Sequence, residues 1–289
     1  EAALLEVAQI QKRHPPYNMA LQPRRYQLCF ATGDFSGFCT RPDARHRLGP
    51  LLRSAPFEML HQIGSQIQGR AATDRPSGGF YGACGIELFG NDPPDVHTIE
   101  AGLALFQDCY AELIDRLGWR AFSAIGRLLL AVARLERPQG EGPAEGEVVL
   151  PADTRWQRSP EGVCRRVASL VRGCARDLCR ARWFCLLSES VLAWPRTPEA
   201  QERVVLAIER GRVSARGTLT KSEALPLPPG YANGRMMRQC CFDGNTYDRM
   251  RVLTTEIRRL VTAGRMLEVR LSRGRALTSQ QLGQVLKLV

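Results

Sequence analysis

Glu6 carries a carboxylate that could hold a divalent cation, and it lies in an amphipathic run near the first residue of this 289-residue chain. Judged from that run alone, it is more often a solvated surface residue. Ala3, Val7 and Ile10 recur at helical spacing and predict one apolar stripe. At ~100° per residue, Glu6 lies about 40° from Ile10 and flanks the buried face. The pair Pro15–Pro16 then ends the predicted helix. A carboxylate at such a position suits Mg²⁺, a hard cation that is commonly held by one or two protein carboxylates.

The run EAALLEVAQIQKRHPPYN, residues 1–18, resembles the closing segment of the GIY-YIG nuclease domain in the UvrC and Cho family of bacterial DNA-repair incision endonucleases. The matching positions are Glu1, Ala2, Leu5, Glu6, Ile10, Lys12, Pro15 or Pro16, Tyr17 and Asn18, whereas Val7, Gln9 and Gln11 depart from the family's pattern. The resemblance implies that Glu6 is catalytic as the ligand of a single Mg²⁺ or Mn²⁺ ion, and that Asn18 belongs to the same site.

The resemblance also implies that a tyrosine acts as proton acceptor and an arginine stabilises the transition state, both on motifs that should precede Glu1. Those motifs are not found downstream, so we expect the chain to start inside the last helix of a GIY-YIG domain and to be inactive alone. The parent is expected to incise damaged DNA by single-metal phosphodiester hydrolysis, in nucleotide excision repair. An alternative is a non-catalytic DNA-binding or repair-complex assembly module.

The charge of the chain favours polyanionic partners. Its formal net charge is +11, and lysine occurs only at Lys12, Lys221 and Lys287, so the other 37 of 40 basic residues are arginine. Arginine binds phosphate bidentately, and neutralised phosphates release counterions. Arginine-favouring codon usage in a GC-rich genome explains the high arginine content at least equally well. The candidate DNA contacts are Lys12, Arg13, Arg41, Arg45, Arg47, Arg165, Arg166 and Arg172, for which a solvated surface is the alternative.

The overall composition predicts a cytoplasmic protein. With 44% hydrophobic residues the chain can bury two compact units, and it has no run of 18 apolar residues that could span a bilayer. No membrane is therefore expected. The resemblance and the positive charge imply DNA as the partner, and the resemblance adds a damage-loading repair protein.

The ten cysteines do not predict a metal site. The four between residues 164 and 185 lack the paired CxxC spacing of structural zinc sites. Some excinucleases of the resembled family carry a four-cysteine iron–sulfur cluster after the nuclease domain, but Cys29, Cys39, Cys84 and Cys109 are too scattered to favour one. Free cytosolic thiols fit the pattern better.

The periodicity predicts an α+β chain in four segments. Residues 1–20 are the C-terminal remnant of the GIY-YIG domain, and 21–137 are a mixed region of strand and helical hairpin. Residues 138–160 are rich in glycine and proline and form a linker or exposed loop. Residues 161–289 form a C-terminal domain of antiparallel sheet and helices.

The middle region begins with a short apolar segment, 26–30, which is followed by turn residues and the basic loop. The glycines of 78–85 do not form a phosphate-binding loop, because the required lysine and serine or threonine are lacking. We predict a strand and a tight turn in this segment. Thr98 is predicted to cap a helix over 99–117, and a second helix is expected over 121–135.

The C-terminal domain is expected to begin with a helix over 161–180, followed by strands over 183–194, 203–209 and 212–219 with a tight turn between the last two. A helix from an Asn245 cap to about residue 263 and a strand over 266–271 come next. The final helix starts with a Thr278–Gln281 capping box. The first strand offers Ser188, Glu189 and Ser190 but no aspartate. It therefore argues against a second, ribonuclease-H-like nuclease centre, which needs several converging carboxylates.

Overall fold

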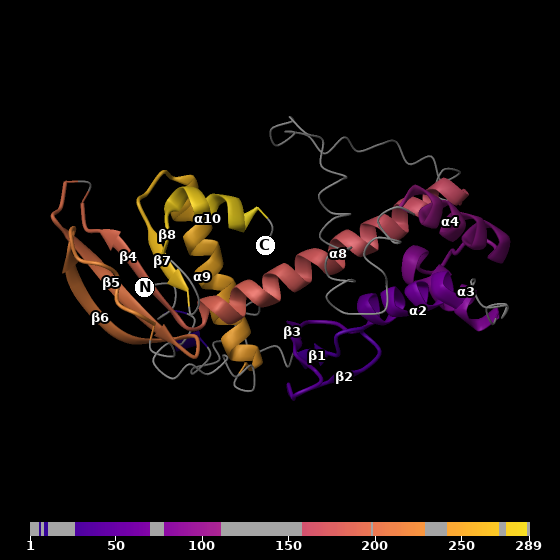
Figure 1. Ribbon diagram of the computed structural model, residues 1–289, viewed down its shortest axis with the longest axis horizontal. Helices are drawn as coiled ribbons and strands as arrows, with labels where there is room; N and C mark the ends of the chain where they lie inside the picture. Colours follow the sequence, from indigo (N-terminus) through magenta and orange to yellow (C-terminus); the bar gives the residue numbers. More distant parts are fainter. Residues whose placement is uncertain are drawn as a thin grey trace. The chain divides into compact units, whose positions relative to one another are not determined.

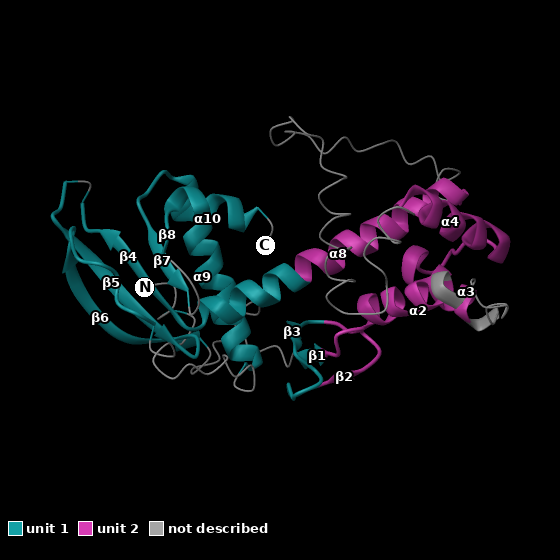
Figure 2. Cartoon of the chain, viewed as in Figure 1, with its two compact units in different colours: residues 1–30, 40–52, 178–289 teal, residues 31–39, 53–177 magenta. Residues whose placement is uncertain are grey.

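The computed structural model describes residues 6, 9–10, 27–69, 78–110, 158–197, 199–228, 242–271 and 276–287. Within these ranges the chain has six helices and two antiparallel sheets, which confirms the expected α+β class. Two compact units are present: unit 1 comprises residues 1–30, 40–52 and 178–289, and unit 2 comprises 31–39 and 53–177 (Figure 2). In the part of the chain described, none of the helices combines the length and apolar character needed to cross a membrane.

The elements follow each other along the chain as shown in Figure 1. They are β1 (Cys29–Ala31), β2 (Phe38–Cys39), β3 (Leu48–Leu51), α2 (Ala55–Gly69), α3 (Gly78–Phe89), α4 (Val96–Cys109), α8 (Pro160–Leu187), β4 (Ser190–Pro195), β5 (Glu202–Glu209), β6 (Arg212–Thr220), α9 (Gly244–Thr262), β7 (Glu268–Leu271), β8 (Ala276–Leu277) and α10 (Ser279–Leu286). The strand order is β2-β1-β3 in the first sheet and β6-β5-β4-β7-β8 in the second.

The second sheet is built around the β5–β6 hairpin that the sequence predicts. Arg210 and Gly211 join the two strands with φ angles of 50° and 71°. Two successive residues of positive φ match the right-handed twist of the flanking strands. β4 pairs antiparallel with both β5 and β7, with Ser190 opposite Ile208 on one side and Leu271 on the other.

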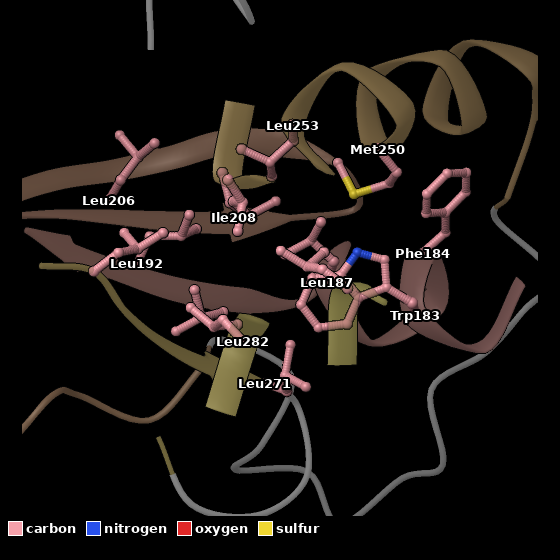
Figure 3. Close-up of a cluster of buried hydrophobic side chains, with 14 of the residues drawn as sticks. Trp183, Phe184, Leu187, Leu192, Leu206, Ile208, Met250, Leu253, Leu271 and Leu282 are labelled. Atoms are coloured by element: carbon pink, nitrogen blue, oxygen red, sulfur yellow. The ribbon is translucent and has the colours of Figure 1, made fainter. Parts of the chain in front are cut away.

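One face of this sheet carries the main hydrophobic core of unit 1, where side chains of β4, β5 and β7 meet those of α8, α9 and α10 (Figure 3). Trp183 and Leu187 of α8 are buried in it, and the indole N–H of Trp183 donates to Thr254 Oγ1 at 2.8 Å. Burial of a polar indole nitrogen is tolerated because this bond satisfies it. The core thereby fixes the C-terminal end of α8 against α9.

The opposite face of the sheet is covered by residues 221–228, which we call the strap. Leu225 of the strap is buried against β4 and β5. Arg203 Nη2 donates to the carbonyl oxygen of Glu223, and Arg270 Nη1 donates to that of Leu225. Two arginines of the sheet therefore hold the strap by its backbone.

Local capping signals explain several helix ends. Thr278 donates its backbone N–H to Gln281 Oε1 at 3.0 Å, so the predicted capping box of α10 is confirmed. Gly264 has a φ of 69° and follows α9, and the N–H of Arg265 reaches back to the carbonyl of Leu260 at 2.9 Å. This is the left-handed closing turn for which glycine is favoured.

Two of the three predicted N-caps, Thr98 and Asn245, are wrong, because an aspartate earlier in the chain caps each of these helices. Asp95 caps α4 and accepts the N–H of Thr98 at 2.9 Å, and Asp243 caps α9 and accepts the N–H of Thr246 at 2.7 Å. Thr98 and Asn245 instead lie in the first turns. The charge of an aspartate is also favourable at the positive helix N-terminus, which explains why it displaces a nearby threonine or asparagine.

Two apolar segments predicted as strands are helical. Residues 78–89 form α3, in which Tyr81, Cys84 and Leu88 are buried at helical spacing. Residues 183–187 continue α8, so the predicted strand over 183–194 starts only at Ser190. Residues 183–187 are an almost continuous buried run, which shows no alternation, so their periodicity does not separate strand from helix. In α3 the buried positions follow helical spacing and Ile86 is 62% exposed, so the strand-and-turn prediction overweighted the glycines of the segment.

Several predictions fall on undescribed residues. The described part of α4 ends at Cys109, and residues 111–157 lie outside the described ranges. This excludes from comparison the second predicted helix, over 121–135, and nearly all of the linker predicted over 138–160.

Gly102 marks a close helix approach in unit 2 and yields a stability prediction. A Cβ on Gly102 of α4 would lie 2.3 Å from Val163 Cβ and 2.8 Å from the backbone oxygen of Pro160. We expect Gly102→Ala to lower the free energy of unfolding by about 1–3 kcal/mol through overpacking. Urea denaturation followed by circular dichroism measures this change in the free energy of unfolding.

Gly173 of α8 is the matched control, because a Cβ there meets no atom within 4 Å. Gly173→Ala is expected to raise stability by roughly 0.5–1 kcal/mol from helix propensity alone. Equal effects of the two substitutions would contradict the close approach of α4 to α8.

Candidate nucleic-acid interface

Glu6 has helical backbone conformation, and its side chain is exposed. Ile10, one turn later, is buried, as the predicted stripe requires. An exposed carboxylate is accessible to a hydrated cation, but it is equally typical of a solvated surface residue, and the metal-ligand role that the resemblance implies stays a prediction. Glu6 belongs to no group of three or more potential metal ligands among the described residues. Asn18, Lys12 and Arg13 lie outside the described residues.

The basic loop between β2 and β3 is organised by one carboxylate, that of Asp43. Asp43 Oδ1 accepts the backbone N–H groups of Arg45 at 2.7 Å and of His46 at 2.8 Å, and the His46 imidazole Nδ1 lies 2.9 Å from Oδ2. The N–H of His46, followed by its ring and by the N–H of Arg45, lowers the pKa of Asp43 to about 2. The carboxylate is therefore ionised at neutral pH, and these bonds weaken only as the pH falls below 3.8 toward 2.

Arg41, Arg45 and Arg47 are exposed around this turn. Residues 40–47 carry these three arginines and one aspartate, which leaves two formal positive charges in excess on a short loop. Guanidinium groups match phosphate oxygens with paired hydrogen bonds. A backbone already ordered by Asp43 loses less conformational entropy when the arginines bind. The loop therefore presents three exposed guanidinium groups of the kind that bind phosphate.

The three arginines predicted on the helix over 161–180 have different surroundings within unit 2. Arg165 and Arg166 are exposed, whereas Arg172 is half-buried. The guanidinium carbon of Arg166 lies 5.5 Å from the centre of the Phe89 ring, a cation–π contact. Arg166 is therefore held in part by a protein ring, and Arg172 is the least accessible of the three to a phosphate.

Ser188, Glu189 and Ser190 have structural roles at the junction of α8 and β4. Ser188 Oγ donates to the carbonyl of Cys185 at 2.9 Å, and Ser190 Oγ donates to that of Leu187 at 2.7 Å. Glu189 Oε1 accepts the backbone N–H of Arg210 at 3.0 Å, and partial burial raises its pKa. These groups close the turn from helix to strand.

The cysteines considered for an iron–sulfur cluster have dissimilar environments. Cys29 lies in β1, where its thiol is 3.6 Å from the carbonyl of Leu51, whereas Cys84 is buried in α3 and Cys109 is exposed at the end of α4. Cys39 lies in β2, and its thiol and the potential ligand atoms of Asp43 and His46 are within 4.8 Å of one another. Burial raises the pKa of Cys84 to about 12.

Sequence reasoning missed a cavity of about 340 Å³ in unit 1, between α8 and α9. Its walls include Arg180, Arg251 and Arg258, which the sequence places on two helices without indicating that they converge. Arg180 is far in sequence from Arg251 and Arg258, so no local sequence pattern predicts that the three residues line one cavity. The only available signal is the concentration of arginine on both helices.

No protein-family profile, curated protein or solved structure matches this chain.

Proposed function

We propose that this chain binds DNA through its phosphate backbone, and that it belongs to an incision nuclease that resembles the UvrC and Cho excinucleases. The observation that supports DNA binding is the 40–47 loop, in which one ionised aspartate orders a turn that carries three exposed arginines. The nuclease assignment rests on the resemblance of residues 1–18 and on the exposure of Glu6 on a helix.

The roles of the residues follow from their chemistry. Arg41, Arg45 and Arg47 bind phosphates, which position a duplex without reading its sequence. Such binding suits a protein that acts at damage in any sequence. Glu6 offers anionic oxygen ligands to a divalent cation, and the cation would polarise the scissile phosphate. A damage-loading repair protein remains a further proposed partner.

Replacing Arg41, Arg45 and Arg47 together by glutamine tests the DNA-binding proposal. Affinity for duplex DNA decreases with salt, and this dependence is expected to become less steep by about 0.9 in log affinity per log salt for each phosphate that an arginine no longer neutralises. In the triple variant the slope should therefore lose up to about 2.7 of its magnitude. Fluorescence anisotropy with a labelled duplex at several salt concentrations measures this slope.

The matched control removes the same charge elsewhere, by glutamine at the exposed residues Arg196, Arg212 and Arg265. An equal decrease of slope in this control would show that net charge alone attracts DNA, and the loop assignment would fail. Asp43→Asn distinguishes the effect of loop order on DNA affinity from the effect of loop charge. It removes a negative charge, which alone would tighten binding, and it weakens the turn, which alone would weaken binding. Weaker binding by this variant supports the ordered loop, and tighter binding contradicts it.

A further inference from the structure

We propose that the cavity between α8 and α9 is a binding site for a phosphate dianion. This site is separate from the 40–47 loop and does not depend on DNA binding by that loop. Its ligand is inorganic phosphate or the terminal phosphomonoester of a nucleic-acid strand or nucleotide, which present the same chemistry.

The positions on the two helices bring the polar groups to one place. Asp248, Arg251, Thr254 and Arg258 recur on α9 at intervals of three, three and four residues, so they share one face. Arg180 and the buried Phe184 add a second wall from α8 at i and i+4. Both helices are fixed at this point by the unit 1 core, because Trp183 of α8 donates to Thr254 of α9 at 2.8 Å. The cavity is therefore preorganised.

The formal charge of the cavity lining favours an anion. Three guanidinium groups and one carboxylate line it, with a formal charge of +2. The Asp248 side chain is only 3% exposed, and its Oδ1 lies 3.6 Å from Arg251 Nη2. At this distance Arg251 and Asp248 form an ion pair rather than a hydrogen bond. The lining as a whole still carries more positive than negative charge, and guanidinium groups bind phosphate oxygens with paired hydrogen bonds.

The other contacts of the lining residues are compatible with this role. Arg258 uses one Nη2 bond, at 3.2 Å, to the carbonyl of Leu286, which docks α10 and restrains the arginine. Phe184 and Tyr247 pack edge to face with ring centres 5.0 Å apart, so they give the cavity a firm apolar wall. Next to such a wall, charge-assisted hydrogen bonds are stronger than in water. A volume of about 340 Å³ is at the lower end of the range for ligand sites.

The test is isothermal titration calorimetry of the whole chain with inorganic phosphate, in chloride buffer at pH 7.5. Arg251→Gln and Arg180→Gln are each expected to weaken phosphate binding about tenfold or more, because each removes a charge-assisted hydrogen-bond donor. Asp248→Asn is expected to tighten binding, because it raises the formal charge of the lining to +3. The opposite sign of this effect keeps the test valid if one arginine variant does not fold.

Arg259→Gln is the matched control. Arg259 lies on α9, outside the cavity lining, and pairs with Glu256 at 2.8 Å. Its replacement removes the same charge from the same helix and should change phosphate affinity less than twofold. No saturable phosphate binding by the unmodified chain, or an equal decrease of affinity in Arg259→Gln, would overturn the proposal.

The source of the phosphate is distinguished by oligonucleotides that end in a 5′-phosphate, a 3′-phosphate or only hydroxyl groups. Preference for one phosphorylated end that Arg251→Gln removes assigns the site to a strand terminus. Binding of free phosphate without any such preference assigns it to a small phosphate ligand. If all three oligonucleotides bind equally and Arg251→Gln weakens them equally, the site takes an internal phosphodiester, and the dianion proposal is wrong. Weaker DNA binding in the Arg41, Arg45 and Arg47 variant would leave these phosphate results unaffected.

Discussion

Glu6→Gln is expected to lower Mg²⁺-dependent nicking about a hundredfold or more in a gene product that joins this chain to the tyrosine and arginine motifs of the resembled nucleases. Glutamine keeps the size and helix propensity of glutamate but removes the charge that attracts a hard cation. A bound metal contributes several kcal/mol to transition-state stabilisation, and a hundredfold decrease corresponds to about 2.7 kcal/mol. Conversion of supercoiled plasmid to the nicked form measures the rate.

DNA affinity distinguishes a chemical role of Glu6 from a structural one. Because Glu6 is exposed, we expect its replacement to change duplex affinity less than about twofold. Glu58→Gln, at an exposed position in the first turn of α2, makes the same chemical change on another helix and should leave nicking unchanged. Full nicking activity in Glu6→Gln would remove the metal assignment and favour the non-catalytic DNA-binding or repair-complex assembly module.

Leu187→Ala is expected to cost about 2–5 kcal/mol of the free energy of unfolding of unit 1. Leu187 is the last residue of α8 and is completely buried in the core that α9, α10 and the sheet share (Figure 3). Truncation removes apolar contacts and leaves a cavity that surrounding helices and strands fill only in part. Chemical denaturation followed by tryptophan fluorescence is suitable, because Trp183 lies in the same core.

Leu227→Ala is the control for Leu187→Ala, since Leu227 is 52% exposed. It should change stability by less than about 0.5 kcal/mol. A similarly small effect of Leu187→Ala would contradict the extension of α8 to residue 187 and the position of its end in the core.

Local sequence signals predict those parts of the fold that depend on a few neighbouring residues. Arg210 and Gly211 predict the β5–β6 turn, and Thr278 with Gln281 predicts the start of α10. Residues 183–187 cannot be assigned in the same way, because they are an apolar run that distant parts of the chain bury almost completely, and its helical state depends on tertiary contacts that periodicity does not contain. Residues 78–89 have buried positions at helical spacing, but the four glycines between 78 and 85 favour a turn by local preference, and packing of the apolar face overrides that preference.

The candidate site divides along the same line. The position of three arginines after a group of turn residues predicts the 40–47 loop, and Pro42 with Asp43 is a pair typical of turns. The phosphate cavity cannot be predicted, because Arg180 and Arg251 meet only after α8 and α9 pack on one core. The assignment of Glu6 as metal ligand rests on the resemblance, and the roles of Asn18, Lys12 and Arg13 stay predictions.

The strap over the second face of the sheet has a consequence for sequence variation. Arg203 and Arg270 bind carbonyl oxygens of the strap, and Arg203 also pairs with Glu268 at 3.0 Å. A carbonyl is the same in every amino acid, so these contacts do not depend on which side chains residues 221–224 carry. Leu225 and Pro228, which are both buried, constrain residue identity by packing, and the Glu223 carboxylate accepts the backbone N–H and the hydroxyl of Thr220 at 2.6 Å and 3.0 Å. The other exposed positions of the strap are therefore expected to tolerate substitution while its path across the sheet is preserved, and substitution of Arg203 or Arg270 is expected to disturb that path.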